Sequence, residues 1–227
     1  MDHMKKVLLL SPPSRSFNHY RPPLALMYLS GYLKHNGIPS KIIDINIKQQ
    51  VRNRKVERNY TRYLREVEDK VVEKVKGEET DIIGITCYTP ELEEVERLVK
   101  RIRYVNPGVK VVVGGIHPTL YPEHFLGPES PFDFAVIGEG ELTLLDLVRA
   151  IRSGEQYFST VHGIGYFDRA SGKNVITPPQ ELAHNLDDIA FPDYEDLDMA
   201  YYTNASPYVV RGVFLRGFYI LSSRGCP

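Results

Sequence analysis

The chain has 227 residues, of which 42% are hydrophobic and 25% charged, with a formal net charge of -1, which suits one globular domain of roughly 150 residues plus an appendage. The near-neutral charge gives no strong field to recruit nucleic acid or an anionic membrane, and no apolar run reaches the roughly 18 residues needed to span a bilayer. Two cysteines form no disulfide framework, so we expect a protein of the reducing cytoplasm.

The amino-terminal region predicts a β-α-β unit. Residues 5–10 are a short apolar run stopped by a serine and two prolines at 11–13, which is typical of a central parallel strand. A helix should begin at Leu24, with a proline in its first turn, and end at the Asn-Gly pair 36–37. Residues 40–45 then predict the second strand.

Strands and helices continue to alternate as far as residue 151. Between residues 48 and 65, seven basic residues and one acid favour a solvated loop, although this charge could also face a phosphate. Further strands are expected over 81–86, 109–113 and 134–137, and helices over 60–76, 92–105 and 142–151. This alternation predicts a doubly wound, Rossmann-like or flavodoxin-like, mostly parallel five-stranded sheet with helices on both faces.

The pattern changes after Gly154. Residues 163–177 predict a β-hairpin with a glycine-containing turn, and residues 181–202 predict an ordered linker with short helical turns. Residues 214–222 predict one more strand. We therefore divide the chain into an α/β domain at 1–154, a hairpin and linker at 155–213, and the start of another domain at 214–227.

Four predicted loops follow the carboxyl ends of strands, where open α/β sheets bind their ligands. They cover 11–23, 86–90, 114–119 and 138–141. Their glycines remove side chains where backbone must approach a large ligand, and their hydroxyls can bond amide or phosphate groups. The candidate cofactor-binding residues are Ser11, Pro12, Pro13, Pro23, Leu24, Thr86, Cys87, Tyr88, Thr89, Gly114, Gly115, His117, Thr119, Gly138, Glu139 and Gly140.

Purely structural roles compete with binding at several of these positions. The glycine pair at 114–115 could only let strand and helix pack closely, and His117 suits a hydrogen-bonded turn as well as a base or metal ligand. Cys87 suits a small buried hydrophobe, and Glu139 and Glu141 suit charges at a helix start. The chain lacks dinucleotide and P-loop glycine motifs, and it lacks any local zinc or Ser/His/Asp pattern.

Five segments, at 11–13, 21–37, 44–46, 114–120 and 136–141, carry a joint resemblance. In this order and spacing, the chain resembles the amino-terminal cobalamin-binding domain of B12-dependent radical S-adenosylmethionine (SAM) enzymes, over residues 5–152. The hairpin and residues 186–194 resemble that family's connector to its catalytic barrel.

The resemblance implies cobalamin as the cofactor, lying over the carboxyl edge of the sheet with its nucleotide tail reaching into the domain. Related cobalamin domains carry an Asp-x-His-x-x-Gly loop after the first strand, whose histidine ligates cobalt. This chain lacks that loop, since His19 precedes Tyr20 and Arg21. We therefore expect a base-off cofactor without a protein imidazole.

The carboxyl-terminal residues 219–227 resemble the first barrel strand of the same family, running into its C-x-x-x-C-x-x-C loop. That loop supplies three ligands to a [4Fe-4S] cluster, and only the first, Cys226, is present here. A single cysteine cannot hold such a cluster. The resemblance thus implies a cluster and SAM in the full-length parent, a methyltransferase or related C–C bond-forming enzyme, whereas this fragment alone should be inactive.

The expected partners are a small-molecule cofactor and the rest of the parent chain, with no nucleic acid and no membrane. Two alternatives stay open. The first is a degenerate scaffold domain of a radical SAM protein that binds no cobalamin, which the missing Asp-x-His-x-x-Gly favours. The second is a flavodoxin-like regulatory or nucleotide-binding domain, which does not account for Cys226.

Overall fold

The computed structural model describes residues 4–12, 22–44, 60–183, 185–203, 206–210 and 213–217. Its strands are β1 (Lys6–Ser11), β2 (Ser40–Asp44), β3 (Thr80–Thr86), β4 (Lys110–Gly114), β5 (Phe134–Val136), β6 (Ile164–Asp168), β7 (Lys173–Ile176), β8 (Ser206–Val210) and β9 (Val213–Leu215). Its helices are α1 (Leu24–His35), α3 (Tyr60–Lys76), α4 (Leu92–Val105), α5 (Ile116–Leu120), α6 (Gly140–Ser153) and α7 (Met199–Tyr202), with 3-10 turns η2 (Thr89–Glu91), η3 (Pro122–Phe125) and η4 (Leu186–Asp188).

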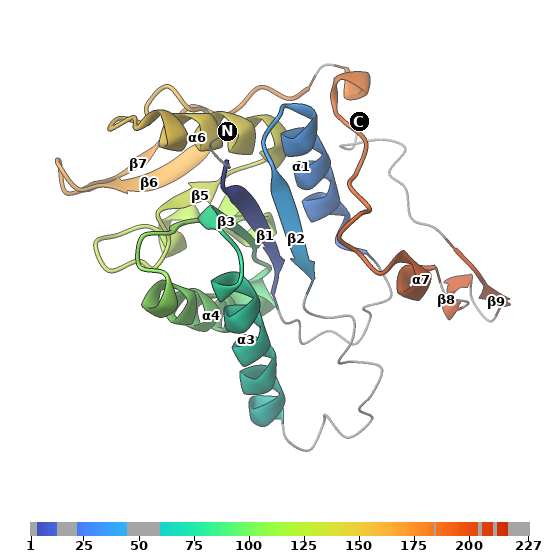
Figure 1. The fold of residues 1–227 in the computed structure, drawn as a ribbon. Coiled ribbons are helices and arrows are strands. Elements are labelled where there is room, and N and C mark those ends of the chain that lie inside the picture. The colour runs from blue at the N-terminus through green and yellow to red at the C-terminus, as the bar shows by residue number, and fades with distance from the viewer. Residues whose placement is uncertain are drawn as a thin grey trace.

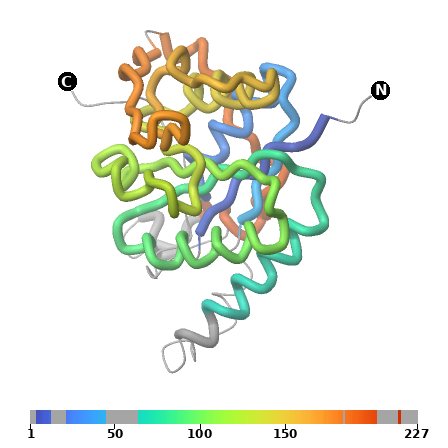
Figure 2. The backbone as a smooth tube through the Cα atoms, turned by 90° about the vertical axis from the view of Figure 1, so that its left-hand side faces the viewer, coloured from blue at the N-terminus to red at the C-terminus, as the bar shows by residue number. Residues whose placement is uncertain are grey.

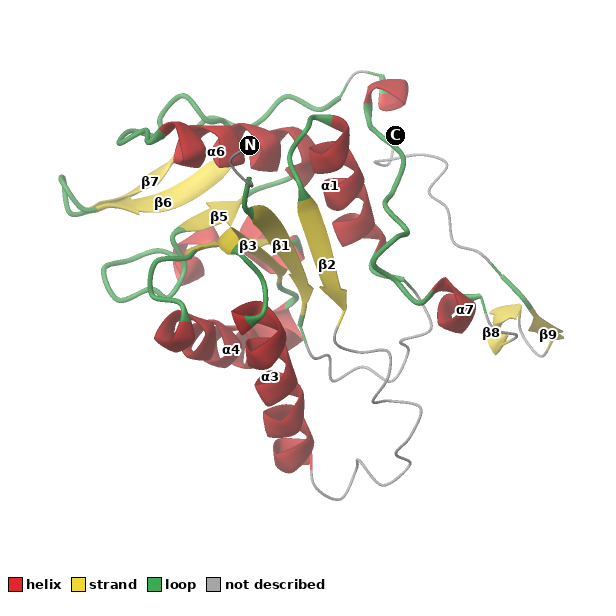
Figure 3. Ribbon diagram, viewed as in Figure 1, coloured by secondary structure: helices red, strands yellow, loops and turns green. Residues whose placement is uncertain are grey.

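The main sheet has seven strands in the order β2-β1-β3-β4-β5-β6-β7, while β8 and β9 form a separate antiparallel pair (Figure 3). The first five strands are parallel, as predicted, and their order is that of flavodoxin-like folds. The hairpin was predicted as a separate unit after the sheet, but it is part of the sheet. It pairs with β5 in antiparallel fashion, for example Ala135 with Gly165, and so extends the same sheet by two strands.

Helices cover both faces of the sheet, which confirms the predicted class (Figure 1). Because successive strand residues point to opposite faces, Leu9 belongs to the core beneath α1 and α6, whereas Leu8 and Leu10 belong to the core beneath α3 and α4. The view in Figure 2 shows α3 extending beyond the body of the domain. Its carboxyl-terminal half is anchored by buried Val71 and Val75.

The predicted element boundaries agree with the structure to within two residues except at three places. Residues 206–210 form β8, although they belong to the segment predicted as linker. Residues 116–120 and 122–125 form the short helical elements α5 and η3, where no helix was predicted. The expected strand over 214–222 is not continuous, because β9 ends at Leu215 and 216–217 are not in a strand. Residues 218–222 lie outside the described part. Gly217 interrupts that run, and glycine weakens strand interiors. The basic residues from 48 to 59 are also outside the described part.

The linker runs along α1 and β2 towards α7 (Figure 1). Buried Asp193 accepts hydrogen bonds from Ser30 Oγ (2.6 Å) and Lys34 Nζ (2.8 Å). The carbonyl oxygen of Phe191 lies so close to α1 that a Cβ on Gly31 would be 2.1 Å away. We call residues 191–202 the strap, because they bind α1 and the edge of the sheet together.

Candidate functional site

A pocket of about 470 Å³ opens at the carboxyl edge of the sheet, between the strands and helices α1 and α6. Its floor is one row of paired residues across three parallel strands, since Leu9 pairs with Gly84 and Gly84 with Val112. We call this row the floor row and the pocket the carboxyl-edge slot. The slot lies where the strand order reverses between β1 and β3, which is the usual ligand site of doubly wound sheets.

Four glycines form the rim of the slot. Gly114 ends β4 in an ordinary conformation, and a Cβ there would meet only the Cβ of Val136, at 3.7 Å. Gly138 has φ +85° and open space around its missing side chain. Gly115, by contrast, has φ 105° and ψ -166°, a region that only glycine populates freely. The glycines predicted at the strand ends therefore lie together at the rim of the slot, and they differ in how well they would tolerate a side chain.

The helical walls and the floor of the slot are not among the residues predicted from the sequence. Leu29 of α1 and Leu144 of α6 line it, together with Glu141 near the start of α6. Glycine at position 84, within an otherwise β-branched apolar strand, was the available signal for the floor. The wall residues gave no separate signal, because their helical spacing is the same as that of ordinary core residues.

The predicted site residues divide into two groups. Thr86, Gly114, Gly115, Gly138, Glu139 and Gly140 line the slot. Ser11, Pro12, Pro23, Leu24, Cys87, Tyr88, Thr89, His117 and Thr119 lie in the same strand-end loops or at the start of α1 but are not among its lining residues. Pro13 and Cys226 lie outside the described residues. Contact of any of them with a cofactor stays a prediction.

Hydroxyl and imidazole groups tie the strand-end loops to one another. Thr119 Oγ1 donates to the carbonyl of Gly115 (2.8 Å) and accepts from the N–H of Gly138 (3.0 Å), so it joins the β4 and β5 loops. Thr89 Oγ1 lies 2.8 Å from His117 Nδ1 and joins the β3 loop to α5. The hydroxyls of Thr119 and Thr89 were expected to face a ligand. In the structure they form hydrogen bonds within the protein that hold the strand-end loops together.

His117 is buried, and both of its ring nitrogens are engaged. Its Nε2 lies 3.1 Å from His124 Nδ1. Burial lowers the pKa of His117, and neighbouring His124 lowers it further, while Glu123 acts in the opposite direction. The imidazole is therefore neutral near pH 7, and the structure agrees with its interpretation as a hydrogen-bonded turn residue.

Cys87 is fully buried against α4. Burial raises the pKa of its thiol to about 12, with smaller contributions from Glu91, Glu96 and Glu94. Since the thiolate is the reactive form, we expect Cys87 in the folded chain to resist labelling by a disulfide reagent at pH 8 and to react upon unfolding in urea. Peptide mapping by mass spectrometry separates it from Cys226, and rapid labelling of Cys87 in the native chain would contradict its burial.

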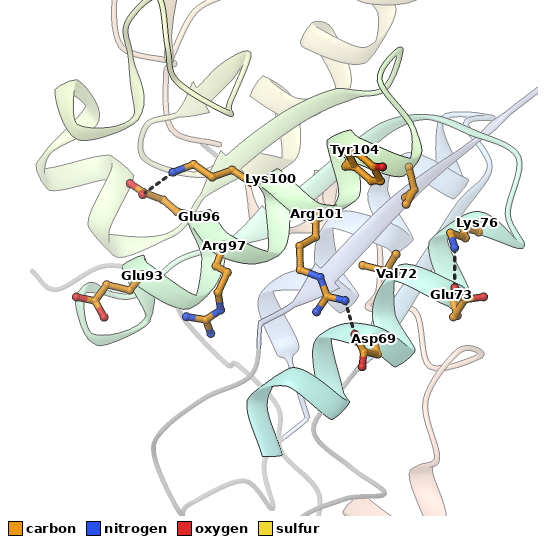
Figure 4. Close-up of a pocket in the computed structure, with 11 residues that line it drawn as sticks. Asp69, Val72, Glu73, Lys76, Glu93, Glu96, Arg97, Lys100, Arg101 and Tyr104 are labelled. Carbon is orange, nitrogen blue, oxygen red and sulfur yellow. Dashed lines mark hydrogen bonds and ion pairs between the residues drawn. The ribbon is translucent and has the colours of Figure 1, made fainter. Parts of the chain in front are cut away.

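A second pocket, of about 670 Å³, lies between α3 and α4 on the opposite face of the sheet (Figure 4). Its charged side chains pair with one another, as in Arg101 with Asp69 and Lys76 with Glu73. Beneath them, buried Glu68 accepts hydrogen bonds from Arg101 and a neighbouring arginine. None of the sequence-predicted site residues lines this pocket, and its paired charges leave no clear excess for a ligand of either sign.

The described part of the chain contains no cluster of three His, Cys, Asp or Glu side chains that could hold a metal ion. Within those same residues, no helix is long and apolar enough to cross a membrane. The carboxyl-edge slot is thus the site that fold and geometry favour.

A flavodoxin-like sheet with a glycine-rimmed slot at its switch point defines a doubly wound, cofactor-binding type of domain. Residues 14–148, more than half of the chain, match the protein family described as B12 binding domain. The chain belongs to this family, which confirms the predicted resemblance.

Among similar proteins is an uncharacterized methyltransferase of Pyrococcus horikoshii, 30% identical over 228 residues, with 98% of this chain and 43% of the relative covered. The anaerobic magnesium-protoporphyrin IX monomethyl ester cyclase of Rubrivivax gelatinosus is 32% identical over 210 residues, covering 91% of this chain and 33% of the cyclase. The chain thus spans less than half the length of these relatives.

Solved structures that share the fold include two enzymes with bound cobalamin. The cobalamin-dependent SAM radical enzyme OxsB, with aqua-cobalamin bound, superposes with a TM-score of 0.64 at 20% identity, over 94% of this chain and 29% of OxsB. The radical SAM methyltransferase TsrM from Kitasatospora setae, with cobalamin and a [4Fe-4S] cluster, gives a TM-score of 0.55 at 20% identity, over 91% of this chain and 33% of TsrM.

Proposed function

We propose that this chain binds cobalamin at the carboxyl edge of its sheet and serves as the cobalamin-binding module of a radical SAM enzyme. One observation carries the proposal: a slot with a side-chain-free rim stands at the switch point of a B12 binding domain fold. The full-length parent, on the same reasoning, is a methyltransferase or related C–C bond-forming enzyme that also uses SAM and a [4Fe-4S] cluster. Its barrel would be the partner of this domain.

The residues at the edge fit such a cofactor. Gly114 and Gly138 leave room for a broad ring to lie against backbone, and the slot, at about 470 Å³, is within the range of small-molecule sites but too small for a whole cobalamin. The corrin would therefore stay at the rim while the nucleotide tail enters. Bound cobalamin supplies a cobalt centre that can carry a methyl group.

The chain's own polar groups would position the cofactor. The hydrogen bonds of Thr119 to Gly115 and Gly138 hold the two glycine loops in register before any ligand arrives, which lowers the ordering cost of binding. His117 is engaged with Thr89 and His124 and is not among the slot-lining residues. This supports a cofactor whose cobalt has no imidazole ligand from the β4 loop.

The test is binding of hydroxocobalamin to the 227-residue chain, followed by gel filtration and visible spectra. Gly114→Leu should weaken binding at least tenfold, because its side chain would enter the slot without backbone strain. Gly108→Leu is the matched control, since Gly108 also has open space around it but lies at the opposite end of β4. We expect this control to bind like the wild type.

A folded wild-type chain that elutes colourless would favour the scaffold alternative over cobalamin binding. Wild-type affinity in Gly114→Leu would mean that cobalamin binds elsewhere on the chain. Circular dichroism of both variants confirms that the comparison is made between folded proteins.

A further inference from the structure

The carboxyl-edge slot changes character with depth. Thr86 and Glu139 line it near the strand ends and buried Glu141 lines it from the first turn of α6, whereas the floor row lies two residues deeper along the strands and is wholly apolar. Leu29 and Leu144, from the two helices, add further apolar surface. A ligand that enters the slot therefore leaves a polar rim and meets an apolar end.

The described residues offer no hydrogen-bonding side chain at that end. The backbone groups of the floor row face neighbouring strands in the parallel ladders between β1, β3 and β4. Of the polar side chains that line the slot, Tyr28, Glu139 and Glu141 are each already engaged in an interaction within the protein. A buried polar atom that reached the floor would thus lose water without gaining a partner, which is unfavourable.

The nucleotide tail of a cobamide ends in a base that differs among natural cobamides. Cobalamin carries dimethylbenzimidazole, whose outer edge has two methyl groups. Other cobamides carry a purine such as adenine, whose corresponding edge has an exocyclic amine and ring nitrogens. Only the methyl-bearing edge of dimethylbenzimidazole matches the apolar floor row. The amine and ring nitrogens of adenine would be buried there without hydrogen-bond partners.

We infer that the floor row selects the lower base of the cofactor, so that this site prefers cobamides with a benzimidazole base over those with a purine base. The inference rests on the proposed function, since it places the nucleotide tail in the slot. It goes further because it makes Val112 and its neighbours in the row determinants of which cobamide the chain accepts.

Equilibrium dialysis of the 227-residue chain against three corrinoids tests the inference. The probes are hydroxocobalamin, the adenine-containing cobamide, and cobinamide, which lacks the nucleotide tail. We expect hydroxocobalamin to bind at least tenfold more tightly than either of the others, because an apolar pocket gains from the benzimidazole and rejects unpaired polar atoms.

A pair of substitutions on one strand assigns the preference to the floor row. Val112→Thr adds a hydroxyl to the floor and should reduce the ratio of cobalamin to adenine-cobamide affinity at least threefold. Val111→Thr makes the same change on the opposite face of the sheet, in the core beneath α3 and α4, and should leave that ratio unaltered. Urea denaturation confirms that both variants fold and that both lose stability.

The possible results are distinct. Equal binding of hydroxocobalamin and the adenine cobamide, or equal binding of cobinamide, would overturn base selection while leaving cobalamin binding intact. An unchanged ratio in Val112→Thr would also overturn the role of the floor row. Failure of all three corrinoids to bind would remove the proposed function and this inference with it.

Discussion

Gly115→Val should lower the free energy of unfolding by about 4 kcal/mol, through backbone strain and steric overlap together. The φ of 105° and ψ of -166° at Gly115 are unfavourable for any residue with a Cβ, and most of all for a β-branched one. A Cβ would also lie 2.8 Å from Thr86 Oγ1 and 3.1 Å from the carbonyl oxygen of Cys87. The backbone carbonyl cannot move without disturbing the β3 loop.

The measurement is urea denaturation, in which the midpoint of Gly115→Val should fall by roughly 1–2 M. Gly138→Val is the matched control, because Gly138 also has a positive φ but no atom within 4 Å of its missing Cβ. It should lose only about 1–2 kcal/mol, from backbone strain alone. Equal losses in the two variants would show that steric overlap at Gly115 is unimportant.

Because Gly115 is needed for folding, it is a poor position at which to test cobalamin binding. If a Gly115 variant lost cobalamin binding, the loss could come from a distorted β3 loop or from a side chain in the slot, since both follow from the same Cβ. Gly114, whose conformation is ordinary, separates the two effects. Adjacent glycines in one motif thus have different reasons for being glycine: one is needed by the backbone and the other by the proposed ligand.

The sequence predicted the parallel sheet well because each of its strands has a strong local signal. The apolar run 109–113 and the helix 92–105 show clear strand and helix periodicity, and both appear with boundaries shifted by at most one residue. The union of the hairpin with the sheet had no such signal. Pairing of Ala135 with Gly165 is a long-range contact, which local periodicity does not encode.

The rim of the site could be predicted from local sequence signals, whereas its floor could not, because the floor depends on long-range packing. Glycines after strands mark the carboxyl edge directly in the sequence, so Gly114 and Gly138 were found. The depth of the slot depends on how α1 and α6 pack over β3, and Leu29 and Leu144 look like any other core leucine in a helix. Only the packed structure distinguishes a leucine that faces a cavity from one that faces another side chain.

The strap likewise depends on distant residues, and we expect Asp193→Ala to reduce the free energy of unfolding by about 2–3 kcal/mol. The substitution removes the carboxylate acceptor of buried Ser30, whose hydroxyl then keeps only its hydrogen bond with Ser40 Oγ, and takes from Lys34 one of its two carboxylate partners. Urea denaturation measures the loss, and limited proteolysis should show faster cleavage within 191–202 as the strap is released from α1. Asp188→Ala, at an exposed site before the strap, should change stability by no more than about 0.5 kcal/mol.

The same carboxylate should make stability depend on pH in a defined direction. Burial raises the pKa of Asp193, but hydrogen bonds from Lys34, Ser30 and the N–H of Glu195 outweigh it, so the net pKa is lowered. Its contribution is therefore complete above the unfolded aspartate value of about 3.9 and is lost as pH falls through the lower folded value. The difference in urea midpoint between wild type and Asp193→Asn should accordingly shrink as the pH is lowered from 6 through this range. A difference that stayed constant would mean that the charge of Asp193 does not hold the strap, and that packing around Gly31 and Phe191 does so instead.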